Sequence, residues 1–338
     1  MPKVVHLIPY DGIGGVESAA RSMVVAGSKD LGFDIFYIFP KVSPDKQRFL
    51  TCNPYYLLRA MWSLFFDTPD VLIVSLWRSC IVGVFLKLFR RNLKLVLFLH
   101  LPTDVHRLDR LFTKAAARFA LQIWADSDAT LKQRLPGIPS DKTRVISFVT
   151  KRFECLEENS VEPKFIFWGR IHPQKGLDRA LDIFSAVRRE YPVARFVIIG
   201  PDGGEKKRIN SLICEMNLSS SVDILDGMGF DGIIHHARES SFYLQTSLQE
   251  GMAMSVVEAM QLGLVPVVTP VGEINHYCKR GENAILVETN SGAVNEIISV
   301  LNDQNKYFSL RRKAIKTWLE KPLYSESVLN VCWEVIHL

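Results

Sequence analysis

The sequence has few cysteines, and none of them are spaced as a pair. The six occur singly, without a Cys-x-x-Cys motif or the compact spacing of a disulfide framework, at Cys52, Cys80, Cys155, Cys214, Cys278 and Cys332. The chain also opens as a strand, Lys3–Pro9, without the charged and apolar layout of a signal peptide, and it contains no repeats. Because disulfide frameworks belong to oxidising compartments, we expect reduced thiols and a cytoplasmic protein.

Long uncharged apolar runs are absent as well. The most apolar stretch, residues 71–89, is interrupted by Arg78 and Lys87. A helix that spans a bilayer needs about 20 nearly uncharged residues, so we reject a transmembrane segment here. The stretch divides better into a buried strand that ends at Ser75 and a helix that begins near Cys80.

Charge is distributed unevenly along the chain. Residues 1–160 hold 22 Lys/Arg and 15 Asp/Glu, whereas residues 161–338 hold 19 and 21. A basic first half suits an anionic surface or an acceptor that bears phosphate, and it is equally compatible with an ordinary solvated face. Residues 87–94 mix apolar and basic side chains, which fits either a peripheral membrane contact or a helix packed on the sheet with a basic end.

The chain is long enough for two domains, since 338 residues exceed one ordinary domain. Apolar strands alternate with helical segments throughout, which predicts parallel α/β sheets. A polar linker at 150–163 separates the halves, and we expect 145–149 to be the last strand before it. The predicted domains are 1–155 and 156–322, with a final helix at 323–338 that crosses back to the first.

A glycine-rich loop follows the first strand and contains Gly12, Gly14 and Gly15. Glycine lets the backbone approach a ligand closely, and the N-terminus of the following helix favours anions. A nicotinamide site is the rival interpretation, but it requires Gly-x-Gly-x-x-Gly and an acid after the second strand. The glycines fit that pattern poorly, and the second strand ends in Pro40 and Lys41. We therefore expect no nicotinamide cofactor.

Two patterns in the second half carry charge toward one edge of the predicted sheet. Arg170 and Lys175 lie in a Gly-Arg-x-x-x-x-Lys-Gly element that joins a strand to a helix, and a guanidinium and an ammonium so placed suit a diphosphate. Glu250 and Glu258 lie in a strand–loop–helix–strand unit, where open α/β sheets bind ligands. Ser255 and Glu258 also match a capping box, so a structural role for Glu258 stays open.

The first half offers one further candidate and one misleading motif. His100 ends the apolar strand at 95–99, although a lone histidine is usually structural. Asp126, Ser127 and Asp128 spell the Asp-x-Asp metal motif of the GT-A glycosyltransferase fold. We interpret Ser127 instead as the N-cap of a helix.

The pattern Glu-Gly-Met-x-Met-Ser-x-x-Glu-Ala-Met-x-x-Gly-x-x-Pro-Val-Val at 250–268, together with the Gly-Arg-x-x-x-x-Lys-Gly element, resembles family 4 of the retaining glycosyltransferases, the glycosyl transferases group 1. The resemblance implies the GT-B fold, two Rossmann-like α/β domains facing a cleft. It implies transfer of a sugar, with retention, from a nucleotide-diphosphate sugar to a saccharide or lipid-linked saccharide, in bacterial surface polysaccharide biosynthesis. No metal, no cofactor besides the donor and no nucleic-acid partner are expected.

The resemblance also implies roles for particular residues. The first glutamate would contact the donor sugar, the second the nucleotide ribose, and the Arg–Lys pair the donor phosphates. The histidine would lie near the donor sugar, and the Gly-Gly loop under the phosphates. The implied catalytic residues are Glu250, Arg170, Lys175 and His100, and the implied donor-binding residues are Gly14, Gly15, Arg170, Lys175, Gly251, Met252, Ala253, Met254 and Glu258.

Some positions depart from the family pattern. Ala253 stands where the family usually has Gly, and Ser255 where it has Pro. The family has a glutamate in the loop that begins here at Gly272. In this chain that acid is either Glu273, or it is absent and His276 stands in its place. Two rival functions therefore stay open: a GT-B-type sugar-nucleotide 2-epimerase, and an inactive module that binds sugar nucleotides.

Overall fold

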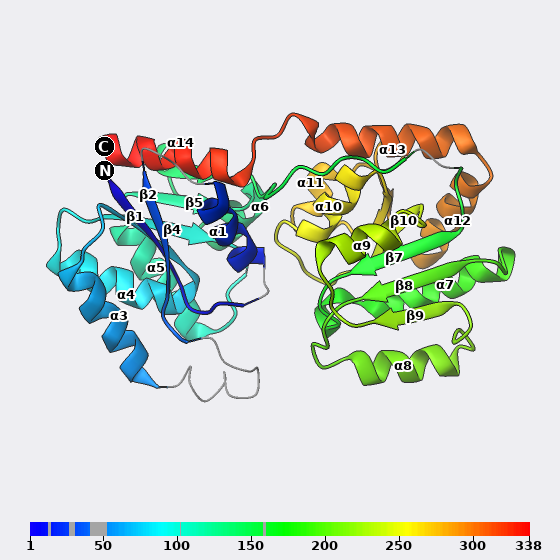
Figure 1. Ribbon diagram of the computed structural model, residues 1–338, viewed down its shortest axis with the longest axis horizontal. Coiled ribbons are helices and arrows are strands. Elements are labelled where there is room, and N and C mark those ends of the chain that lie inside the picture. Colours follow the sequence, from blue (N-terminus) through cyan, green and yellow to red (C-terminus); the bar gives the residue numbers. More distant parts are fainter. Residues whose placement is uncertain (13–14, 27–30, 41–52, 102, 158–159) are drawn as a thin grey trace. The chain divides into compact units, whose positions relative to one another are not determined.

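The computed structural model describes the whole chain except residues 13–14, 27–30, 41–52, 102 and 158–159. It divides into two compact units, one formed by Met1–Lys151 with Pro322–Leu338 and the other by Arg152–Lys321 (Figure 1). Each unit contains one six-stranded sheet, and the strand pairs in both sheets are parallel. This is the α/β architecture that alternating strands and helices predict.

The sheet of the first unit has the strand order β2-β1-β3-β4-β5-β6. All five residues of β3 are buried, as are five of the six in β1. Continuous apolar strands of this kind belong to sheets that are covered on both faces. The strands are β1 (Lys3–Ile8), β2 (Gly32–Tyr37), β3 (Val71–Ser75), β4 (Lys94–Leu99), β5 (Gln122–Ala125) and β6 (Thr143–Val145).

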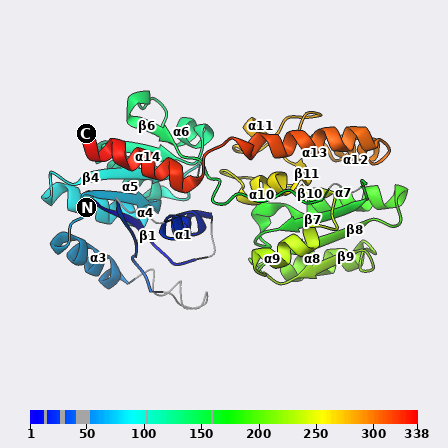
Figure 2. The ribbon, with the colours of Figure 1, turned by 45° about the horizontal axis from the view of Figure 1, so that its top comes forward.

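Helices α4 and α5 pack on each other and on the strands of this sheet, and α3 packs beside α4. The last helix, α14, packs against α1 (Figure 2). The Lys94 Nζ donates to the carbonyl of Ile336 at 2.5 Å. The helical segments are α1 (Gly15–Ala26), α3 (Pro54–Phe66), α4 (Leu76–Phe89), α5 (Arg107–Phe119), α6 (Asp128–Arg134), the short η1 (Ser140–Lys142) and α14 (Tyr324–His337).

The last strand of the first unit begins earlier than predicted. β6 covers Thr143–Val145, and residues 146–149 lie outside the ladder. The backbone N–H of Ile146 makes a last bond to the Ala125 carbonyl, and the carbonyl of Val149 then accepts from the N–H of Tyr324. Ile146, Phe148 and Val149 are buried, and the Phe148 ring contacts that of Tyr324 in α14. The sequence pattern alone does not distinguish such a buried segment from a strand.

The sheet of the second unit has the order β12-β11-β10-β7-β8-β9. Its strands are β7 (Lys164–Trp168), β8 (Arg195–Ile199), β9 (Val222–Leu225), β10 (Phe242–Gln245), β11 (Val265–Val268) and β12 (Ile285–Leu286). Its helical segments are η2 (Pro173–Lys175), α7 (Leu177–Glu190), α8 (Lys206–Glu215), α9 (Phe230–Ala237), α10 (Met254–Leu262), α11 (Ile274–Tyr277), α12 (Asn290–Leu301) and α13 (Gln304–Leu319).

The parallel strands of the second unit bring three loops to one edge. The segments after β7, β10 and β11 leave the carboxyl ends of adjacent strands in the order β11-β10-β7. Carboxyl ends of parallel strands are where open α/β sheets bind ligands. Elsewhere, none of the helices in the described ranges is both long and apolar enough to cross a bilayer.

Candidate functional site

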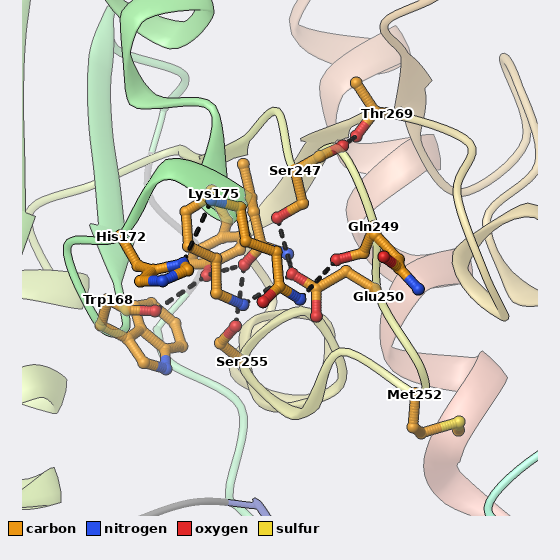
Figure 3. Close-up of polar contacts among 12 residues, drawn as sticks. Trp168, His172, Lys175, Ser247, Gln249, Glu250, Met252, Ser255 and Thr269 are labelled. Atoms are coloured by element: carbon orange, nitrogen blue, oxygen red, sulfur yellow. Dashed lines mark hydrogen bonds and ion pairs between the residues drawn. The ribbon is translucent and has the colours of Figure 1, made fainter. Parts of the chain in front are cut away.

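A buried ion pair lies at the centre of this edge (Figure 3). The Nζ of Lys175 lies 2.6 Å from the Oε1 of Glu250, and the two side chains are 15% and 8% exposed. The same carboxylate oxygen accepts from the Ser247 hydroxyl at 2.6 Å and from the Gln245 amide at 3.2 Å. The position of Glu250 is therefore set by three side chains, which all contact one of its carboxylate oxygens.

The tight contact between the β7 and β10 loops places Lys175 there. Gly176 has a φ of 58°, and a Cβ at this position would lie 2.3 Å from the Thr246 carbonyl oxygen. The Thr246 hydroxyl donates to the Gly176 carbonyl at 2.6 Å, and the Gln174 amide donates to the Gln249 carbonyl at 2.7 Å. Only glycine fits such a left-handed close approach. The glycine of the Lys-Gly pair therefore allows the close contact that positions the lysine.

Glu258 has a different environment from Glu250. Its Oε2 accepts from the indole Nε1 of Trp168 at 2.8 Å. Burial raises the pKa of Glu258 to about 7, and the hydrogen bond from Trp168 partly opposes that rise. The two carboxylates of the motif are thus chemically distinct, one paired with a cation and the other poised to titrate near neutral pH.

The predicted capping box at Ser255 is wrong. Helix α10 begins at Met254, and its N-cap residue is Ala253, which makes no side-chain capping bond. The Ser255 hydroxyl donates instead to the Oε1 of Gln245 at 2.9 Å. Because the helix starts earlier than the pattern suggested, Glu258 lies beyond the first turn's capping position and contacts Trp168.

The loop from Glu250 to Ala253 is fixed by the segment after β11. Gly272 has a φ of 56°, and a Cβ there would lie 2.1 Å from the Glu250 carbonyl oxygen. The N–H of Glu273 donates to the Gly251 carbonyl at 3.1 Å, and the Tyr277 hydroxyl donates to the Met252 carbonyl at 2.9 Å. The backbone of Glu273 therefore lies beside the Glu250 segment.

Ala253 and its neighbours form the turn into α10. Ala253 is buried and has a φ of 56°, a left-handed conformation that costs an L-residue roughly 1 kcal/mol. Gly251, Met252 and Met254 are partly exposed around it. The turn into α10 thus holds an alanine in a conformation that glycine adopts without strain.

Arg170 is placed differently from Lys175. It follows β7, is exposed, and forms no hydrogen bond or ion pair with any residue in the described part of the chain. Burial lowers the pKa of His172, and the nearby charges of Arg170 and, more weakly, Lys175 lower it further. The two cations therefore contribute to one positive field at this edge.

The residues expected in the first unit fall into two groups. Gly15 is the exposed first residue of α1, and Gly14 lies outside the described residues. His100 is buried just after β4, and its Nε2 lies 2.8 Å from the Ser75 hydroxyl, which is also 2.7 Å from the Nε2 of His6. Burial lowers the pKa of His6 to about 3, and burial with the neighbouring His6 lowers the pKa of His100 well below its usual value. The lowered pKa values favour neutral rings, and because one hydroxyl can donate to only one of the two Nε2 atoms, the other Nε2 must donate to it, so the two rings hold different tautomers.

The Asp-x-Asp motif is a helix start, as predicted. The Ser127 hydroxyl accepts from the N–H of Thr130 at 3.1 Å and caps α6. Asp126 accepts from that same hydroxyl at 3.1 Å. Among the residues that the structure describes, no group of three or more His, Cys, Asp or Glu side chains is arranged to hold a metal ion.

Sequence reasoning missed three members of the site. Trp168 binds Glu258, the Gln245 amide joins Ser255 to Glu250, and Ser247 binds Glu250. The available signal was position, since Trp168 and Gln245 are the last residues of neighbouring strands. The partner of Trp168 lies 90 residues away in sequence, so the type of residue alone did not indicate a role.

Comparisons with known proteins agree with this arrangement. A family model described as glycosyl transferases group 1 matches residues 149–317. An uncharacterized glycosyltransferase of Methanocaldococcus jannaschii is 34% identical over 163 residues, which are 46% of this chain and 37% of the relative. A GDP-mannose:cellobiosyl-diphosphopolyprenol alpha-mannosyltransferase of Xanthomonas campestris is 21% identical over 159 residues, which are 46% of this chain and 42% of the relative. The matched segment thus spans less than half the length of these two proteins.

The structural comparison covers the whole chain. The crystal structure of Anabaena HepE in complex with UDP-glucose matches with a TM-score of 0.79 at 18% identity, over 99% of this chain and 100% of that one. At such identity the likeness establishes the fold, and the predicted GT-B class with its two Rossmann-like α/β domains is confirmed. Since the family model covers half of the sequence and includes Arg170, Lys175 and both glutamates, the chain belongs to the glycosyl transferases group 1 family.

Proposed function

We propose that this protein is a retaining, metal-independent glycosyltransferase that moves a hexosyl group from a nucleotide-diphosphate sugar to a saccharide or lipid-linked saccharide. The observation that carries the proposal is the Lys175–Glu250 ion pair at the carboxyl edge of a parallel sheet, together with the exposed Arg170, which has no ion-pair partner among the residues that the structure describes. Fixed cations at such an edge suit a diphosphate. Family membership supports the same substrate class.

Each residue then has a role in the reaction. The Arg170 guanidinium and the remaining protons of the Lys175 ammonium bind the diphosphate and stabilise its charge as the glycosidic bond breaks. Glu258 accepts hydrogen bonds from the ribose, and the Glu250 loop, with Gly251, Met252, Ala253 and Met254, surrounds the sugar.

The chemical step needs little from the protein beyond positioning and charge. The bond from the anomeric carbon to the diphosphate oxygen breaks through an oxocarbenium-like transition state. The acceptor hydroxyl attacks on the same face, and its proton passes to the leaving diphosphate. The family resemblance assigns His100 to the donor sugar and the loop of Gly14 and Gly15 to the donor phosphates, and we include these assignments in the proposal.

The acceptor is proposed by analogy. The Xanthomonas relative is named for a lipid-linked saccharide acceptor, a diphosphopolyprenol. An acceptor of that class, used at the cytoplasmic face of a membrane in the assembly of a bacterial surface polysaccharide, fits the basic first half of the chain.

Calorimetric titration with UDP and GDP, followed by donor hydrolysis with the matching nucleotide sugars, tests the proposal. Arg170→Ala is expected to weaken nucleoside-diphosphate binding by at least about tenfold, whereas Arg189→Ala, on the exposed end of α7, leaves it unchanged. Activity is expected to survive EDTA. Equal nucleotide affinity in both variants would refute the phosphate clamp, and an epimerised sugar nucleotide formed without acceptor would identify an epimerase.

A further inference from the structure

One face of α3 exposes large apolar side chains instead of polar ones. The opposite face buries Ala60 and Leu64. The exposed positions recur at intervals of three or four residues, which places them in a single row along the helix. They are Tyr55 (60% exposed), Leu58 (63%), Trp62 (70%) and Phe66 (66%).

The row continues onto the end of α4. The ring of Phe65 lies 6.5 Å from that of Phe89, and the Arg90 guanidinium stacks 4.3 Å from the Phe65 ring. Arg90 also donates to the Phe65 carbonyl at 3.0 Å, which fixes the two helix ends together. Leu88 and Phe89 are 56% and 63% exposed. We call these six side chains the α3–α4 apolar surface: Tyr55, Leu58, Trp62, Phe66, Leu88 and Phe89.

Basic residues outnumber acidic ones in the segment that carries this surface. Residues 54–120 contain ten Lys/Arg and four Asp/Glu. All four acids are engaged within the unit: Asp67 and Asp70 with Lys3, Asp104 with Arg110, and Asp109 with Arg134. Exposed cations remain beside the apolar row at Arg59, Arg90 and Arg91.

Lys87, in contrast, is not part of this charged rim. Its ammonium donates to the carbonyls of Arg91 and Leu93 at 2.7 Å each, and burial lowers its pKa. Part of the basic stretch 87–94 therefore serves to end α4. The exposed apolar side chains of α3 form more of the surface than this stretch does.

We propose that the α3–α4 apolar surface is a docking surface for a membrane that contains anionic lipid. A surface helix with Trp, Tyr and Leu on one face and arginines at its border is the pattern of interfacial binding. The helix would lie in the membrane plane, with its aromatic side chains at the level of the headgroups and Arg59, Arg90 and Arg91 against lipid phosphates.

The charge favours a membrane over a second copy of this chain. A two-fold dimer would place the same patch on both sides of the contact, so it would bring three exposed arginines from each copy into one interface. Like charges across an interface are unfavourable, whereas an anionic lipid surface attracts all three. The proposal is independent of which sugar or acceptor the protein uses.

Sedimentation with vesicles tests this surface. The protein is expected to bind vesicles of phosphatidylcholine mixed with phosphatidylglycerol, and to bind vesicles of phosphatidylcholine alone at least about tenfold more weakly. Trp62→Glu is expected to reduce binding to the anionic vesicles by at least about tenfold. The matched control is Val193→Glu, an equally exposed apolar position at 73% in the second unit, which should bind as the parent protein does.

Two further measurements keep the result unambiguous. Thermal unfolding and nucleotide titration of Trp62→Glu should match the parent, because the side chain is 70% exposed. Sedimentation equilibrium without lipid shows whether a dimer forms. Equal vesicle binding by Trp62→Glu and the parent, no binding to anionic vesicles, or a dimer that Trp62→Glu abolishes would each overturn the proposal.

Discussion

The buried ion pair between Lys175 and Glu250 predicts a large and specific cost when the lysine is removed. In Lys175→Met, the carboxylate of Glu250 keeps its hydrogen bonds from Ser247 and Gln245 but loses its cation. Breaking one side of a buried pair usually costs 3–5 kcal/mol. Because two donors remain, we expect the lower end, about 3 kcal/mol. For a unit of this size that corresponds to a fall in Tm of roughly 6–12 °C.

A second substitution gives a sharper test, because its effect on stability should change sign between two backgrounds. Glu250→Gln in the parent protein should destabilise by about 1 kcal/mol, since the amide oxygen still accepts from Lys175. In the Lys175→Met background the same change removes an unpaired buried charge, so it should stabilise by about 2 kcal/mol. The two single changes would then be coupled by about 3 kcal/mol.

Denaturant unfolding of the four proteins measures this cycle. Lys164→Met provides a matched control, because the Lys164–Glu162 pair is 37% and 50% exposed and should cost less than about 1 kcal/mol. If Lys175→Met unfolds like the parent, or if Glu250→Gln destabilises both backgrounds equally, the ion pair does not contribute as argued. Arg170→Ala, which breaks no hydrogen bond or ion pair with a described residue, is then the cleaner probe of phosphate binding.

Three other outcomes follow from particular contacts. Ser75→Ala leaves two buried imidazole nitrogens without their hydrogen-bond partner and should lower the free energy of unfolding by at least about 2 kcal/mol. Ser79→Ala removes a buried hydroxyl that has no partner among the described residues and should lower it by less than about 0.5 kcal/mol. Equal unfolding curves for the two variants would refute this difference. Ala253→Gly relieves a left-handed alanine and should stabilise by up to about 1 kcal/mol, while Ala115→Gly inside α5 should destabilise by a similar amount in the same thermal assay. The pKa of Glu258 is raised to about 7 in the folded protein, so the fold loses stability as pH rises from the usual carboxyl range through 7. The free energy of unfolding of Glu258→Gln should therefore rise relative to the parent by up to about 3 kcal/mol between about pH 5 and pH 8. Parallel pH profiles of the two proteins would contradict the assignment.

Short-range patterns in the sequence determined the secondary structure and the places where charge collects. The Ser127 cap, the strand at 95–99 and the helix after Gly176 follow from local residue types, and the structure has all three. The two parallel sheets follow from alternation, because a parallel strand needs a crossover that a helix supplies. Arg170, Lys175 and Glu250 could be selected for the same reason, since strand ends of one sheet converge on one edge.

Only the tertiary structure decided which of these groups meet. Trp168 and Glu258 are ninety residues apart in number and bind through neighbouring elements, so neither one indicates the other. The capping box at Ser255 failed because Gln245 competes for its hydroxyl and Ala253 starts the helix in a left-handed turn. The local sequence pattern indicates which contacts a residue can make with its neighbours along the chain. Burial and hydrogen-bond partners also depend on contacts between segments that are distant in sequence. The ion pair, the titrating glutamate and the exposed face of α3 are all decided at that second level.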